Sequence, residues 1–132
     1  MRTVVRRMLI GSLVLLSGCD AQEMVEKRMV ERRVLLLKEY PPGTSKANVM
    51  AKLGPQRPVL ECSAERPANG WHSLPPIPGS NFAMLSEERT GKSVHKFERY
   101  IHVHDHAGPC SFWFFYDEND ILVDASWFWE TS

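Results

Sequence analysis

The strongest constraint on the fold is an alternation of apolar and polar side chains toward the C-terminal end of the chain. From residue 94 onward this pattern has a period of two, which is typical of strands because successive side chains point to opposite faces. Gly108-Pro109 and the polar run 117–120 divide the stretch into three parts. Because short connections join these parts, the sequence predicts a three-stranded antiparallel meander.

The last strand of this meander, residues 121–129, has aromatic and aliphatic side chains on both faces. Strict alternation puts one set of residues on the first face: Ile121, Val123, Ala125, Trp127 and Trp129. The second face then receives Leu122, Asp124, Ser126 and Phe128. One face of the sheet is expected to cover the helices that precede it.

Two helices are predicted before the sheet. In residues 43–55, Thr44 is a suitable N-cap, Gly54 suits a left-handed C-terminal residue, and Pro55 prevents continuation. The apolar positions of this helix fall on one face: Val49, Met50 and Leu53. Residues 20–39 are predicted to form a longer helix, although the apolar run 34–37 is also compatible with a strand.

The middle of the chain is rich in proline. Residues 58–62 are compatible with a short edge strand, and residues 63–93 are predicted to form a long loop, in which Trp71, Phe82, Met84 and Leu85 suggest local packing. Loops of this length in a small domain are usually functional or mobile.

The N-terminus has the layout of a secretory signal, with Arg2, Arg6 and Arg7 before a short apolar run. The tetrapeptide that follows, Leu16-Ser17-Gly18-Cys19, resembles the bacterial lipobox, in which the cysteine is acylated and becomes the new N-terminus. The alternative is an ordinary secretory signal with an incidental cysteine. The predicted organisation is a signal peptide over 1–18, an acylated tether over 19–33, and a single α+β domain over 34–132.

The remaining cysteines, Cys62 and Cys110, form an even pair in the oxidising compartment that such a signal implies. The prediction is a disulfide between them, with two buried free thiols as the alternative. Neither cysteine lies in a Cys-x-x-Cys pattern, which argues against a redox catalyst.

The charge balance excludes a general nucleic-acid function. The chain has 16 Lys+Arg and 16 Asp+Glu, and three of the arginines lie in the signal peptide, so the mature part is mildly acidic. A mildly acidic protein has no electrostatic footprint for phosphates, so no nucleic-acid partner is expected.

The chain resembles a known family in its order of elements: a lipobox, a helix, a short capped helix, and an aromatic meander. It is similar to the SmpA/OmlA (BamE-like) family of small envelope lipoproteins, and the residues that carry the resemblance are Gly43, Thr44, Val49, Leu53, Gly54 and Pro55. The family typically has a Met before the Thr and one residue between the Gly and the Pro, and this chain has neither. The resemblance implies two N-terminal helices packed on a three-stranded meander, a fold that also resembles the β-lactamase-inhibitor-protein-like unit.

Three histidines near the end of the first predicted strand form a candidate metal site. His102, His104 and His106 would share one face of a strand, and imidazole is a common ligand of Zn²⁺ and Cu²⁺. The alternative, which the sequence favours, is a polar strand face opposite a core made by Ile101 and Val103. No resident cofactor is expected.

Aromatic residues on both faces of the meander suggest a partner surface. The candidates for this surface are Trp113, Phe115, Trp127 and Trp129. Exposed apolar patches mark interaction sites, but the long loop could equally fold over the second face and bury these side chains.

Together these features predict a lipoprotein attached to the inner or outer membrane through acylated Cys19 and facing the periplasm. No catalytic triad, nucleotide-binding loop or zinc-protease motif is present in the sequence, so a non-catalytic protein-binding module of envelope assembly or maintenance is favoured over an enzyme. The alternatives are a periplasmic enzyme inhibitor of the same fold and a metal-binding protein built on the histidine strand.

Overall fold

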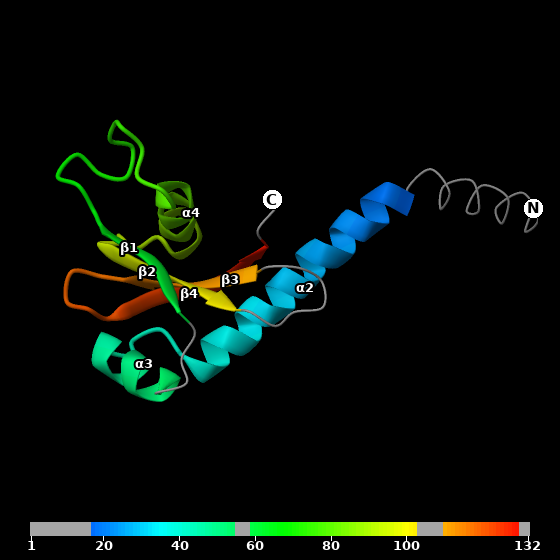
Figure 1. Cartoon of the computed structure of the whole chain (residues 1–132), viewed down its shortest axis with the longest axis horizontal. Coiled ribbons are helices and arrows are strands. Elements are labelled where there is room, and N and C mark those ends of the chain that lie inside the picture. Colours follow the sequence, from blue (N-terminus) through cyan, green and yellow to red (C-terminus); the bar gives the residue numbers. More distant parts are fainter. Residues whose placement is uncertain (1–16, 55–58, 103–109, 130–132) are drawn as a thin grey trace, which may run out of the picture.

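The computed structural model describes residues 17–54, 59–102 and 110–129. Within these ranges the elements follow the order α2, α3, β1, α4, β2, β3, β4, and the four strands form one antiparallel sheet (Figure 1). The α+β class is confirmed. The predicted two helices and three strands are one helix and one strand short of what the structure contains.

The sheet has the strand order β1-β2-β3-β4, so each strand pairs with its neighbour in sequence. Its strands are β1 (Leu60–Glu65), β2 (Lys96–His102), β3 (Cys110–Tyr116) and β4 (Leu122–Trp129). The last three strands are the predicted meander. β1 is added at the open side of β2, where it forms one edge of the sheet.

A β-bulge changes the predicted faces of β4. Phe115 lies opposite Asp124, but the next residue, Tyr116, lies opposite Leu122, so one residue of β4 is extra. As a result Leu122 packs in the same core cluster as Ala125 and does not share a face with Asp124. Strict alternation was wrong here because one bulge reverses the face of every residue beyond it.

Helix α2 (Ser17–Glu39) packs on the sheet only through its C-terminal part. Leu36 and, just beyond the helix, Tyr40 are buried, whereas Met24 and Val30 are exposed. Figure 1 shows the N-terminal part of the helix extending away from the sheet. The run 34–37 is therefore helical, and Pro41-Pro42 follows the point at which the helix ends.

Helix α3 (Lys46–Leu53) begins one residue later than predicted. Its N-cap is Ser45, whose hydroxyl accepts a hydrogen bond from the Asn48 N–H at 3.2 Å. Thr44 is not the cap because its backbone C=O accepts a hydrogen bond from the N–H of Leu122, and its hydroxyl donates to the C=O of Pro41. Gly54 ends the helix as predicted, with a positive φ of 69°, but its ψ of −173° differs from the left-handed helical conformation that was expected.

Helix α4 (Ser80–Thr90) lies inside the segment that was predicted to be a loop. Its buried side chains are small: Ser80, Ala83 and Ser86. The prediction of a long loop over 63–93 was therefore wrong, since the segment begins with the end of β1 and contains a helix of 11 residues. The sequence of α4 has no apolar stripe that would predict a helix, because small and polar residues make its buried face.

The two faces of the sheet carry two separate aromatic cores. The core on the side of α2 and α3 contains Leu36, Tyr40, Val49, Tyr100, Phe112, Phe114, Tyr116, Leu122 and Ala125. The core on the side of α4 contains Trp71, Ala83, Val94, Phe97, Trp113 and Phe115. Figure 1 shows α3 and α4 on opposite sides of the sheet. Three layers result, with the sheet in the middle.

A buried carboxylate connects the layers at β4. Asp124 is 1% exposed and makes ion pairs with Arg33 of α2 at 2.8 Å and with Arg89 of α4 at 3.0 Å. The hydroxyl of Ser86 donates a third hydrogen bond to it at 2.9 Å. Because a buried carboxylate requires partners, this position fixes both helices to the same strand.

Candidate functional site

The predicted aromatic partner surface is not one surface. Trp113 and Phe115 are 3% and 0% exposed and belong to the core beneath α4. Trp127 packs at the margin of the opposite core, and the side chain of Trp129 lies outside the described part of the structure. The prediction was wrong for Trp113 and Phe115 because the segment between β1 and β2 folds over the second face, which was the alternative.

The predicted disulfide is also not formed. Cys62 is a free, partly buried thiol. It lies opposite Arg99, whereas Cys110 lies opposite His102 on the far side of β2, so the two cysteines are separated by a whole strand and by three positions along it. Strands are about 4.8 Å apart, and a disulfide requires Cα atoms within about 7 Å. The pairing was wrong because spacing in the sequence does not show register.

The histidine hypothesis is not tested by the structure. His102 is the last residue of β2, and its side chain is not described, while His104 and His106 lie outside the described residues. Among the described side chains, no group of three or more His, Cys, Asp and Glu is placed to hold a metal ion.

Cys19, the predicted lipidation site, is the third residue of α2, and its side chain is not described. None of the helices in the described ranges combines the length and the apolar character needed to cross a membrane. Thirteen and fourteen positions after Cys19, α2 contacts β4, where Arg32 lies over the ring of Trp127 at 5.6 Å and Arg33 reaches Asp124.

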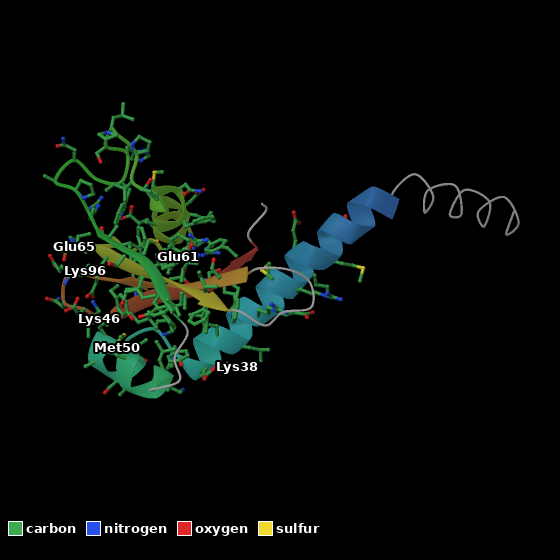
Figure 2. All side chains as sticks on the ribbon, in the orientation of Figure 1. Lys38, Lys46, Met50, Glu61, Glu65 and Lys96 are labelled. Carbon is green, nitrogen blue, oxygen red and sulfur yellow. The ribbon has the colours of Figure 1, made fainter. Side chains whose placement is uncertain are left out.

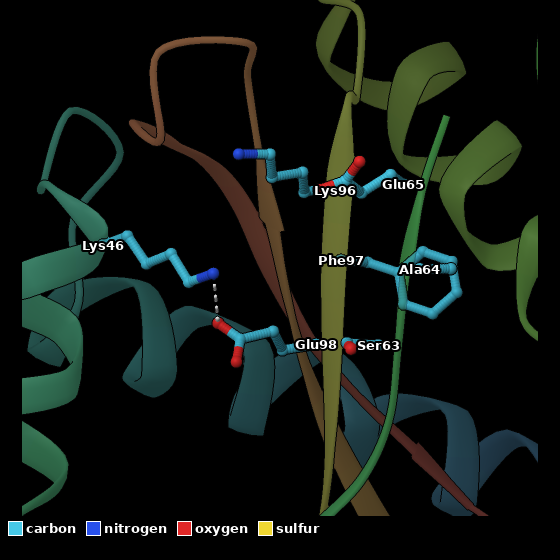
Figure 3. A pocket seen from close by; sticks show the side chains of 7 residues that line it. All are labelled: Lys46, Ser63, Ala64, Glu65, Lys96, Phe97 and Glu98. Atoms are coloured by element: carbon cyan, nitrogen blue, oxygen red, sulfur yellow. Dashed lines mark ion pairs between the residues drawn. The ribbon is translucent and has the colours of Figure 1, made fainter. Parts of the chain in front are cut away.

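The structure instead presents a small polar pocket, which we call the β1–β2 pocket. It has a volume of about 210 Å³ and is lined by Lys46, Ser63, Ala64, Glu65, Lys96, Phe97 and Glu98 (Figure 3). Lys46 is the first residue of α3, and the other residues come from β1 and β2. Four of the seven lining residues carry a charge, so the pocket is suited to a polar ligand.

Glu98 is the most unusual residue of the pocket because its side chain is only 7% exposed. Its Oε2 accepts a hydrogen bond from the hydroxyl of Tyr100 at 2.9 Å. Its Oε1 has no hydrogen-bond partner, and the nearest cation, the Nζ of Lys46, lies 3.8 Å away. A buried carboxylate oxygen without a hydrogen bond is costly, so Oε1 is an acceptor that a donor would satisfy.

The phenol of Tyr116 lies beneath the same carboxylate. The side chain is fully buried, and its hydroxyl interacts with the Glu98 carboxylate without reaching the geometry of a full hydrogen bond. Burial raises the pKa of this hydroxyl well above its ordinary value, and the negative charge of Glu98 raises it further. The Tyr116 phenol therefore stays protonated, and Lys46 lies 5.7 Å from the centre of its ring.

Lys96 is held at the rim of the pocket by Asp120. Its Nζ lies 2.8 Å from the Asp120 carboxylate, and this hydrogen bond raises the pKa of Lys96 and lowers the pKa of Asp120. Glu65, by contrast, makes no ion pair with a described residue. The charges of the pocket are thus only partly paired.

Sequence reasoning missed this pocket. Lys46 and Glu98 are separated by 52 positions, and neither belongs to a recognised motif. The one available signal was Glu98 itself, because a carboxylate between Phe97 and Tyr100 on a strand with a core face is unexpected.

The outer edge of β1 adjoins the pocket. β1 is the end strand of the sheet and pairs with β2 alone among the described strands. Leu60, Glu61, Ser63 and Glu65 are exposed along it. Edge strands of this kind are common places for contacts with other chains.

No family model, curated protein or solved structure matches this chain. Membership of the SmpA/OmlA family therefore stays a prediction that rests on the motif residues of α3 and on the order of elements.

Proposed function

We propose that this chain is a lipid-anchored, non-catalytic protein-binding module of the bacterial cell envelope, active in outer-membrane assembly or maintenance. Acylated Cys19 would hold it on the inner or outer membrane, with the folded domain in the periplasm. Two or more acyl chains give a stable anchor, since each buried CH₂ contributes about 0.8 kcal/mol.

The observation that carries the proposal is the geometry of α2 relative to the lipobox. Cys19 lies at the start of α2, and Arg32 and Arg33 are the positions at which the helix meets β4. Thirteen helical residues span about 20 Å. A helix of this length would act as a stalk that keeps the domain clear of the lipid headgroups, which favours contact with a periplasmic protein.

A binding role is supported by the surface at the far end of the molecule from the start of α2. The β1–β2 pocket and the exposed edge of β1 lie there, and both offer unpaired polar groups. Such groups are suited to recognition because a partner can satisfy them on binding.

The test is mass spectrometry and membrane fractionation of the full-length protein made in a Gram-negative host. We expect a processed form that begins at Cys19, carries fatty acyl chains, and sediments with membranes. The Cys19→Ser variant should lack these chains and leave the membrane fraction. An unprocessed or unacylated wild-type product would overturn the anchor.

Crosslinking in intact cells, followed by affinity purification, tests the binding role. An envelope assembly factor should capture components of the outer-membrane assembly machinery. Capture of a soluble hydrolase would contradict the assembly role and favour the inhibitor.

A further inference from the structure

We propose that the β1–β2 pocket binds one cationic side chain, an arginine or a lysine, presented by the protein partner. This inference rests on the proposed function, because it names the chemistry by which the partner would be recognised. It is carried by an excess of carboxylate at the pocket, by the orphan oxygen of Glu98, and by the position of the pocket in the molecule.

The charge balance at the pocket favours a cation. The lining holds two carboxylates, Glu65 and Glu98, and two ammonium groups, Lys46 and Lys96, and Asp120 lies outside the lining beside Lys96. Lys96 is neutralised by Asp120 at 2.8 Å, and Lys46 is shared with Glu98 at the longer distance of 3.8 Å. One negative charge is left over, so a ligand with a single positive charge would complete the pairing.

The hydrogen-bonding capacity points to the same ligand class. The Oε1 of Glu98, which lines the pocket, is buried and has no hydrogen-bond partner. A guanidinium or ammonium group carries only donors, so it matches a carboxylate acceptor, and hydrogen bonds between charged groups are the stronger kind. An anion would instead meet Glu65 and Glu98 and be repelled.

Lys46 is placed to act as an internal competitor. Its side chain reaches from α3 toward Glu98 across the pocket (Figure 3) and is 35% exposed, so it can swing away without breaking a short hydrogen bond. An incoming arginine would take the place of Lys46 beside Glu98 and would also approach Glu65 on β1.

The place of the pocket selects a protein over a lipid headgroup as the source of the cation. Figure 2 shows Lys46, Glu65 and Lys96 at the end of the molecule opposite the start of α2. The acyl anchor at Cys19 would be at the membrane end, so the pocket faces away from the anchoring bilayer.

The direct test uses two small probes that differ in charge alone. Nα-acetyl-arginine methylamide and the neutral, nearly isosteric Nα-acetyl-citrulline methylamide are titrated into the ¹⁵N-labelled full-length protein in zwitterionic micelles. We expect the arginine probe to shift the amide signals of residues 63–65 and 96–98 and to bind about tenfold more tightly than citrulline. Equal binding of both probes, or shifts elsewhere, would overturn the inference.

Two pocket variants should change arginine binding in opposite directions. Glu98→Gln should weaken it about tenfold, whereas Lys46→Gln should strengthen it several-fold, because the competing cation is removed. Glu88→Gln, which removes the same charge from an exposed position of α4, should leave it unchanged. A gain in Lys46→Gln cannot come from misfolding, so loss of binding in both pocket variants would refute the charge argument.

The failure of this inference and of the proposed function can be told apart. If wild-type protein captures an envelope partner and Glu98→Gln captures it equally well, the pocket is not the recognition site. The proposed function as a binding module is then supported without the pocket. If the arginine probe binds as described but no envelope partner is captured, cation binding by the pocket is supported and the proposed envelope function is refuted. Vesicles of phosphatidylethanolamine that compete with the probe would show a lipid source and refute the protein one.

Discussion

Gly79 lies against the aromatic core beneath α4. An added Cβ would lie 2.6 Å from the indole ring of Trp113 and 3.0 Å from the ring of Phe97, and the φ of Gly79 is +89°. Gly79→Ala is therefore expected to lower the free energy of unfolding by about 2–3 kcal/mol, through backbone strain and overpacking together. Urea unfolding followed by tryptophan fluorescence measures this change.

Gly91→Ala is the matched control because Gly91 also has a positive φ, of +69°, but no atom lies within 4 Å of its added Cβ. It should cost only the left-handed strain, about 1 kcal/mol. Equal losses in the two variants would show that the contact with Trp113 has no effect on stability.

Cys62 is expected to react with alkylating reagents without prior reduction, because it is a free thiol. The reaction is expected to be slow at neutral pH. Burial raises the pKa of its thiol, and the neighbouring Arg99 guanidinium only partly opposes this shift. Since the thiolate is the reactive form, iodoacetamide labelling should be slower than that of a free cysteine peptide at pH 7 and should rise steeply in alkaline solution. Peptide mass spectrometry measures the rate. If Cys62 were labelled only after treatment with a reductant, it would be disulfide-bonded, as the sequence predicted.

At the scale of elements, α2 has a buried side and an exposed side where it meets the sheet. Its C-terminal end supplies Leu36, 6% exposed, to the core, whereas the adjacent Leu35 is 63% exposed. The sequence could not show which side of the helix is buried, because the apolar residues of 20–39 do not fall on a single face.

Leu36→Ala is therefore expected to lower the free energy of unfolding by about 3 kcal/mol, through lost burial and a cavity. Leu35→Ala, the same change one residue earlier, should alter it by less than about 0.5 kcal/mol. Denaturant midpoints of the two variants provide the measurement. Similar losses would mean that α2 packs through a different face.

The elements also show where prediction from the sequence succeeded. α3 was predictable because its start and stop signals are local: a capping residue, a short apolar face and Gly54-Pro55. The meander was predictable because runs rich in aromatic and β-branched residues lie between breaks in the chain. β1 was only suggested as a short edge strand, and α4 was missed because Ser80, Ala83 and Ser86 bury a polar face that becomes favourable only against the sheet.

At the scale of the whole molecule, Asp124 joins three layers that the chain order keeps apart. Arg33 precedes it by 91 positions and Arg89 by 35, and both reach its buried carboxylate. The packing of α2 on one side and of α4 on the other is therefore coupled through one strand.

Asp124→Asn is expected to destabilise the fold by about 3 kcal/mol, because both arginines lose their partner while remaining partly buried. Asp120→Asn, which disrupts the exposed pair with Lys96, should have a much smaller effect. Thermal unfolding of both variants, with hydrogen exchange in α2 and α4, measures the difference. Loss of protection in only one helix would contradict the coupling.

The sequence by itself determined the α+β class, the meander and the capped helix α3, because each depends on neighbouring residues, and the lipid anchor stays a prediction. Only the tertiary structure decided which aromatic side chains are buried, that Cys62 and Cys110 lie on strands separated by β2, and that Lys46 meets Glu98. The physical reason is that register, bulges and the covering of a sheet face depend on contacts between distant segments. The energies of these contacts cannot be read from a local sequence pattern.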